Sequence, residues 1–152
     1  MNKVAIETHI EHSQAWITKK VQFTRICPIT AIFIDKYHHC DTKIYPLNTK
    51  QEVVEKDIDE QVFLRNSELL IVIYPSKILR NDSIEVLEGY IKPMIDKESL
   101  LVIDCVVMSV YDIKTEYCSL SASEVICKDD KFLLGTWKEY DFDTLELKGE
   151  RF

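Results

Sequence analysis

Residues 67–108 read SELLIVIYPSKILRNDSIEVLEGYIKPMIDKESLLVIDCVVM, and this stretch decides the predicted fold. Two near-continuous apolar runs, at residues 69–74 and 100–107, are typical of strands that are buried on both faces. Pro75 lacks a backbone donor and is expected to end the first run. Apolar side chains at helical spacing predict a helix over residues 83–92. The pattern therefore predicts two adjacent parallel strands that a helix joins in a right-handed connection.

The first third of the chain has a less regular pattern. Residues 3–10 alternate between apolar and polar side chains, which favours a strand. Apolar residues from Ile6 to Val21 also fall on one helical face, so a helix within residues 3–23 stays open as an alternative. We expect three further segments: a strand over residues 26–34, a polar loop over residues 35–41 and a short strand over residues 43–47.

Residues 49–65 predict a second helix. Thr49 can cap its first turn, and an acidic residue stands three positions later, as in a capping box. A stripe of apolar residues at helical spacing is expected to face the core: Val54, Ile58 and Val62. The opposite strip of this helix is acidic and consists of Glu52, Glu55 and Asp59.

The last third of the chain, from residue 110 onward, contains short alternating runs, the last of them at residues 144–147. Asp129 and Asp130 separate two of these runs at a predicted hairpin turn. We expect a single domain, α/β or α+β, with a mixed β-sheet, a central strand–helix–strand unit and a C-terminal antiparallel meander. The alternative is an α+β fold with a fully antiparallel sheet and two helices on one face.

The composition narrows the choice of partners. The chain has 152 residues and a formal net charge of −7, which disfavours nucleic acid as a partner and favours a basic protein. No apolar run reaches the about 18 residues that a bilayer-spanning helix needs, so no membrane partner is predicted. The five cysteines are odd in number and lie mostly in apolar runs. This usage is typical of free thiols in the reducing cytoplasm.

The sequence predicts neither a cofactor nor a metal. With three glycines in the chain, a glycine-rich phosphate loop is excluded. Residues 38–41, HHCD, have the chemistry of zinc ligands, but adjacent histidines on one loop seldom point at one ion. His9 and His12 can complete such a site only if the fold brings them close to this loop.

Residues 66–90, NSELLIVIYPSKILRNDSIEVLEGY, resemble the middle of Toll/interleukin-receptor-like domains, where a buried strand leads to a helix with a catalytic glutamate. They are also similar to nucleoside 2-deoxyribosyltransferases, which have an Asp-Ser pair followed by Glu, Gly and Tyr. Either resemblance implies a small flavodoxin-like enzyme that acts on a nucleotide, with Glu88 as the catalytic carboxylate. Ligands of parallel sheets bind beyond the carboxyl ends of the strands, which adds Asp35, Ser76 and Asp82 as candidates.

Asp104 is a carboxylate within the second apolar run. A buried carboxylate is costly unless it is paired, and such residues often mark functional sites. The other interpretation is structural: Asp104 pairs with a lysine or a backbone donor, or it lies on a solvated face of the sheet.

The preferred hypothesis is a small acidic protein-binding module of the cytoplasm, because no specific catalytic motif occurs in the sequence. Immunity proteins, inhibitors that neutralise a partner such as a toxin, exemplify this class and gain specificity from charge complementarity. A phage or viral accessory factor is a further alternative, in line with a composition rich in Ile and Lys. The residues expected to contact the partner are Glu52, Glu55, Asp59, Trp137 and Tyr140.

Overall fold

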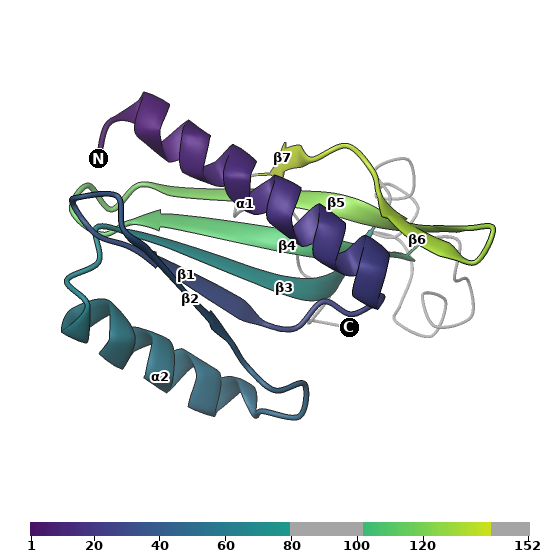
Figure 1. Ribbon diagram of the computed structural model, residues 1–152, viewed down its shortest axis with the longest axis horizontal. Helices are drawn as coiled ribbons and strands as arrows, with labels where there is room; N and C mark the ends of the chain where they lie inside the picture. The colour runs from purple at the N-terminus through teal and green to yellow at the C-terminus, as the bar shows by residue number, and fades with distance from the viewer. Residues whose placement is uncertain (80–101, 141–152) are drawn as a thin grey trace, which may run out of the picture.

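The computed structural model describes residues 1–79 and 102–140 (Figure 1). Within these residues, two helices accompany a seven-stranded sheet of order β2-β1-β3-β4-β5-β6, with β7 paired to β5. All described pairings are antiparallel, which makes the fold α+β. The elements are α1 (Lys3–Thr24), β1 (Thr30–Ile34), β2 (Cys40–Ile44), α2 (Gln51–Leu64), β3 (Leu69–Leu79), β4 (Val102–Asp112), β5 (Cys118–Lys128), β6 (Lys131–Leu134) and β7 (Lys138–Tyr140).

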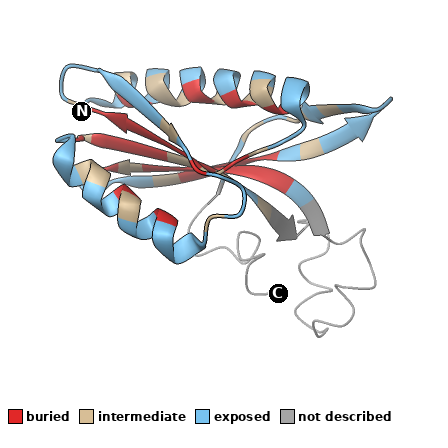
Figure 2. Cartoon of the chain, turned by 60° about the horizontal axis from the view of Figure 1, so that its bottom comes forward, coloured by how far each residue is buried: buried red, intermediate tan, exposed pale blue. Residues whose placement is uncertain are grey.

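The two helices lie on opposite faces of the sheet, and Figure 2 shows the buried strand residues between them. Ile17 of α1 shares a core with Ile32 of β1, whereas Val54 of α2 shares a second core with Phe33. Successive residues of a strand point to opposite faces, so β1 contributes to both cores. All five residues of β1 are therefore buried.

Strands β3 and β4 are neighbours, as predicted, but they are antiparallel, so the predicted parallel pairing is wrong. Their register places Leu69 opposite Asp112. Long apolar runs arise whenever both faces of a strand are covered, and here helices on opposite faces provide this cover without a parallel connection. The helix predicted over residues 83–92 lies outside the described residues. The fully antiparallel alternative is confirmed for the described strands, and the two described helices lie on opposite faces of the sheet.

Pro75 does not end β3, which continues to Leu79. The partner strand β1 pairs with β3 only as far as Ile73. Beyond that residue, this edge of β3 has no partner among the described strands, and a proline is tolerated there because no ladder hydrogen bond is lost.

Helix α1 replaces the strand predicted over residues 3–10, and the helical alternative is confirmed. The Asn2 side-chain oxygen accepts a hydrogen bond from the backbone N–H of Ala5 at 2.8 Å and caps the first turn. Ile6, Ile17 and Val21 are buried on one helical face. The alternation that favoured a strand covers a few residues only, whereas the helical spacing extends over the whole segment.

Helix α2 confirms the helix predicted over residues 49–65, with Val54 and Ile58 buried. The predicted cap at Thr49 is wrong, because the helix begins at Gln51. Lys50 occupies the cap position and makes no side-chain capping bond. Because no side chain caps the first turn, the helix is stabilised mainly by packing of its apolar stripe against the sheet.

The C-terminal antiparallel meander is confirmed by the consecutive pairing of β4, β5 and β6. Asp129 and Asp130 form the predicted turn with φ values of 52° and 60°, and two left-handed residues give the twist of a tight hairpin. In the first third, β1 is shorter than predicted, and β2 begins at Cys40, before the predicted residue 43. The strand predicted over residues 144–147 lies outside the described residues.

Candidate binding groove

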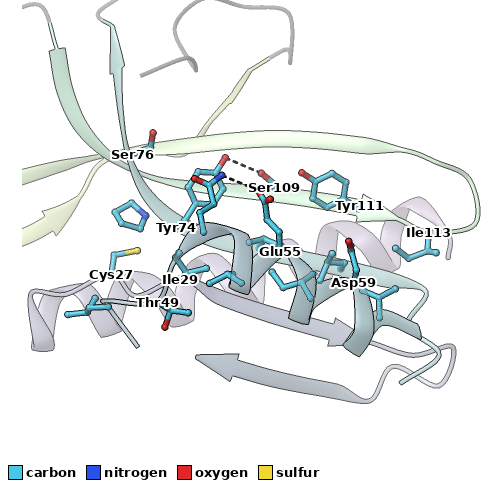
Figure 3. Close-up of a pocket in the computed structure, with 18 residues that line it drawn as sticks. Cys27, Ile29, Thr49, Glu55, Asp59, Tyr74, Ser76, Ser109, Tyr111 and Ile113 are labelled. Carbon is cyan, nitrogen blue, oxygen red and sulfur yellow. Dashed lines mark hydrogen bonds between the residues drawn. The ribbon is translucent and has the colours of Figure 1, made fainter. Parts of the chain in front are cut away.

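A groove of about 870 Å³ lies between α2 and strands β3 and β4 (Figure 3). Helix α2 packs over β1 and the near side of β3, where Phe33 and Leu70 share a core with Val54. The helix does not extend over the adjoining part of β3 and β4 on the same face of the sheet. The groove runs along the side of α2, above these two strands. Concave sites of this size commonly bind small molecules or segments of a partner.

Alternate residues of two paired strands build the floor of the groove. Val72 of β3 lies opposite Ser109 of β4. In the same way, Leu70 lies opposite Tyr111. The Tyr74 hydroxyl is 3.5 Å from the Ser109 hydroxyl. The floor therefore combines apolar surface with a few hydroxyl groups.

The wall of the groove is the side of α2 that carries Gln51, Glu55 and Asp59, each four residues from the last. The Gln51 amide donates a hydrogen bond to Glu55 Oε1 at 2.9 Å, which orients that carboxylate. Of the described residues that line the groove, none is a lysine, arginine or histidine. Within the part of the lining that the structure describes, the Glu55 and Asp59 carboxylates therefore face no cationic side chain.

The residues predicted to contact a partner fall into two groups. Glu55 and Asp59 line the groove, and Glu52 is exposed one turn away on the same helix. Trp137 is half-buried against the core beneath α1, on the opposite face of the sheet from the groove, and its role as a partner contact stays a prediction. Tyr140 belongs to β7, opposite Leu120 of β5. The acidic strip of α2 and Trp137 therefore lie on different faces of the sheet.

The residues predicted for a nucleotide site are not brought together. Asp35 follows the end of β1, next to the start of β3, whereas Ser76 lies towards the far end of β3 and lines the groove. The Asp35 carboxylate accepts hydrogen bonds from the backbone of Tyr37 and His39 and so closes a turn. Because the described sheet is antiparallel, the carboxyl ends of its strands do not meet at one edge. Asp82 and Glu88 lie outside the described residues.

Asp104, the carboxylate within the second apolar run, is exposed on β4. Its backbone partner on β3 is Lys77. The structural interpretation, a carboxylate on a solvated face of the sheet, is confirmed. The buried carboxylate of this strand is Asp112, whose residue surface is 2% exposed.

The histidines of the polar turn meet one partner from α1. His9 approaches His38 and Cys40, whereas His39 contacts Asp35. Within residues 1–79 and 102–140, no three His, Cys, Asp or Glu side chains are arranged so that they could hold a metal ion.

A second depression, of about 470 Å³, lies beyond the end of α2. Two of the cations that line it are paired with carboxylates: Arg65 contacts Asp41 at 2.6 Å, and Lys114 contacts Glu68 at 2.8 Å. A third, Lys36, lies over the Tyr37 ring. The groove beside α2, whose described lining has carboxylates and no cation, is therefore the better candidate for a cationic partner.

Sequence reasoning missed the floor of the groove: Leu70, Val72, Tyr74, Ser109 and Tyr111. From the sequence alone the apolar floor residues are indistinguishable from core residues, because a run of apolar residues does not reveal which face of the strand is left partly uncovered. One signal was available in the second run. Ser109 and Tyr111 follow its last apolar residues at alternate positions, which is the period of a strand with one polar face.

The five cysteines give a prediction about reactivity. Burial raises the pKa of the Cys27 thiol and of the Cys105 thiol to about 12, so little thiolate forms at neutral pH. We expect the exposed Cys40, Cys118 and Cys127 to be alkylated first in the native protein. Mass spectrometry of a time course with iodoacetamide measures this order, and equal rates for Cys105 and Cys118 would contradict it. Alkylation after denaturation without reductant tests the expectation that all five are reduced.

Of the described helices, neither is long and apolar enough to cross a membrane. No protein-family model, curated protein or solved structure matches the chain.

Proposed function

We propose that this chain is a protein-binding module whose groove takes up a cationic and partly apolar segment of a partner protein. The observation that carries this proposal is the juxtaposition of an acidic wall, Glu55 and Asp59, with an apolar floor around Val72. A lysine or arginine side chain suits both surfaces, because its aliphatic stem packs on apolar groups while its charged end reaches a carboxylate.

The charge of the chain supports the same class of partner. The formal net charge is −7, and the exposed Glu52 and Glu60 extend the negative surface of α2 beyond the groove. Such a field raises the rate at which a basic protein associates and disfavours acidic competitors. We propose that the chain acts in the cytoplasm as an inhibitor of the immunity-protein kind, which binds a basic enzyme or toxin and neutralises it.

A binding experiment tests the groove directly. A pull-down with the full chain, followed by mass spectrometry, identifies the partner, and stopped-flow mixing measures the association rate constant. We expect the double variant Glu55→Lys/Asp59→Lys to lower this rate constant by at least about tenfold at low salt, and by less at about 0.15 M salt. Adding Glu52→Lys should lower the rate further. Circular dichroism should not change, because all three side chains are exposed.

The matched control is Glu7→Lys/Glu11→Lys, which changes the net charge equally at exposed positions of α1, on the other face of the sheet from the groove. We expect this control to keep most of the association rate. An equal loss in both double variants would show that overall charge, and not the groove, attracts the partner. An unchanged rate in the Glu55→Lys/Asp59→Lys variant would refute the proposal.

A further inference from the structure

Two histidines from distant parts of the chain meet beside the first half of α1. His9 lies on α1, and His38 lies in the turn between β1 and β2 with a left-handed φ of 66°. His9 Nε2 and His38 Nδ1 are 3.0 Å apart, within hydrogen-bond distance. Figure 1 shows this turn next to the start of α1. The contact therefore joins the edge of the sheet to the helix that covers one of its faces.

The geometry of the two rings is that of a hydrogen bond in which His9 Nε2 and His38 Nδ1 share one hydrogen. The ring centroids are 5.2 Å apart, close to the nitrogen–nitrogen distance plus two ring radii, and the planes are inclined by 19°. The two nitrogens thus face each other along the line between the rings. One nitrogen must donate and the other must accept, which requires that at least one of the two imidazoles is neutral.

The groups around the pair do not supply a compensating negative charge. On α1, His12 adds a further imidazole near His9. In the turn, Asp35 is bound to the backbone of Tyr37 and His39 and contacts the His39 ring at 3.3 Å. On β2, Cys40 Sγ lies 3.9 Å from His9 Nδ1, and Asp41 contacts Arg65 at 2.6 Å.

We propose that His9 and His38 form a proton-operated clasp, closed while they share one hydrogen between α1 and the β1–β2 turn, and open when both rings are protonated. With both rings protonated, two N–H groups face each other and two positive charges meet. Burial is the main cause that lowers the pKa of His9, and the charges of His38 and His12 lower it further. Histidine charge changes near neutral pH, and because the pKa of His9 is lowered, the clasp opens once the pH falls below the ordinary histidine range.

Opening of the clasp breaks the contact between the β1–β2 turn and α1, and leaves the contact between β2 and α2 in place. The contact of Asp41 with Arg65 at 2.6 Å holds the start of β2 against the end of α2 and involves neither His9 nor His38. Asp35 stays ionised, because its backbone hydrogen bonds outweigh its burial and keep its pKa below the usual value. Once the turn separates from α1, its backbone hydrogen bonds to Asp35 lose the support of the helix and open more often.

Amide hydrogen exchange of residues 37–39, measured by NMR and corrected for intrinsic pH dependence, tests the clasp. In the wild-type chain, we expect exchange of these amides to become about tenfold faster between about pH 8 and about pH 5. In His9→Gln and in His38→Asn, a neutral amide replaces one ring, and this acceleration should disappear. In the same experiment, His38→Asn should move the NMR titration of the His9 ring towards that of a free histidine.

The control variant is His12→Gln, which removes a neighbouring histidine of α1 that makes no contact with the turn among the described hydrogen bonds. It should keep the acceleration. Exchange that does not depend on pH in the wild-type chain would overturn the proposal. So would a His9 titration that His38→Asn leaves unchanged, or a loss of the acceleration in His12→Gln equal to that in His9→Gln.

Discussion

Replacing Ile71 by aspartate should prevent the chain from folding. Ile71 is completely buried on β3, between β1 and β4, in the core beneath α1. An aspartate there removes a large apolar side chain and places a charge where no cationic partner lies within the described core. We expect a loss of more than about 4 kcal/mol, which exceeds the effect of most single substitutions and is a large part of the stability of an ordinary domain.

Circular dichroism and size-exclusion chromatography measure this outcome. The matched control is Thr42→Asp, which places the same carboxylate at an exposed position of the edge strand β2. The control should fold and unfold in urea close to the wild-type midpoint. A folded Ile71→Asp variant with near wild-type stability would show that β3 is not the buried centre of the sheet.

The centrality of β3 and β4 could be predicted from their apolar runs, but the direction of their pairing could not. A strand becomes continuously apolar when both faces are covered, and parallel connections are only one way to cover them. Here α1 packs on one face and α2 on the other, so residues such as Ile32 and Phe33 are both buried. A continuous apolar run shows that a strand is buried. The direction in which it pairs depends on the path of the segments that connect the strands.

The candidate site was predictable only in its charged part. Glu55 and Asp59 stand out because like charges at helical spacing repel slightly and have no role in packing. The floor of the groove arises from a step between α2 and the sheet, which is a tertiary feature. The same limit applies to His9 and His38, because no local pattern shows that residues 29 positions apart will meet.

The two aspartates of β4 show this limit most directly. Asp104, surrounded by apolar residues in the sequence, is exposed, whereas Asp112, at the end of the strand, is buried. The Asp112 carboxylate accepts hydrogen bonds from the backbone of Lys114 and Thr115, and it lies 3.4 Å from the Met1 amino group. The residues adjacent in the sequence are therefore a poor guide to the burial of a strand residue that lies near a turn and the start of a helix.

Replacing Asp112 by alanine should cost about 3 kcal/mol of the free energy of unfolding, because two backbone donors and an amino group lose a buried partner. The control Asp104→Ala, on the same strand but exposed, should change stability by less than about 0.5 kcal/mol. Urea denaturation of the three proteins at neutral pH measures both values. Equal effects of the two substitutions would contradict the buried role of Asp112.

The dependence of this difference on pH provides a second measurement. Burial alone raises the pKa of Asp112, but the backbone hydrogen bonds from Thr115 and Lys114 and the charge of the amino group outweigh it, so the folded-state pKa lies below the usual value. A carboxyl group with a lowered folded-state pKa stabilises the protein fully above its unfolded pKa of about 4 and loses this contribution as the pH falls. The stability difference between the wild-type chain and Asp112→Ala should therefore be constant near neutral pH and shrink below about pH 4. Other carboxylates titrate in both proteins and cancel in the difference, so a gap that stays constant into acid would show that the ionised form of Asp112 does not carry the effect.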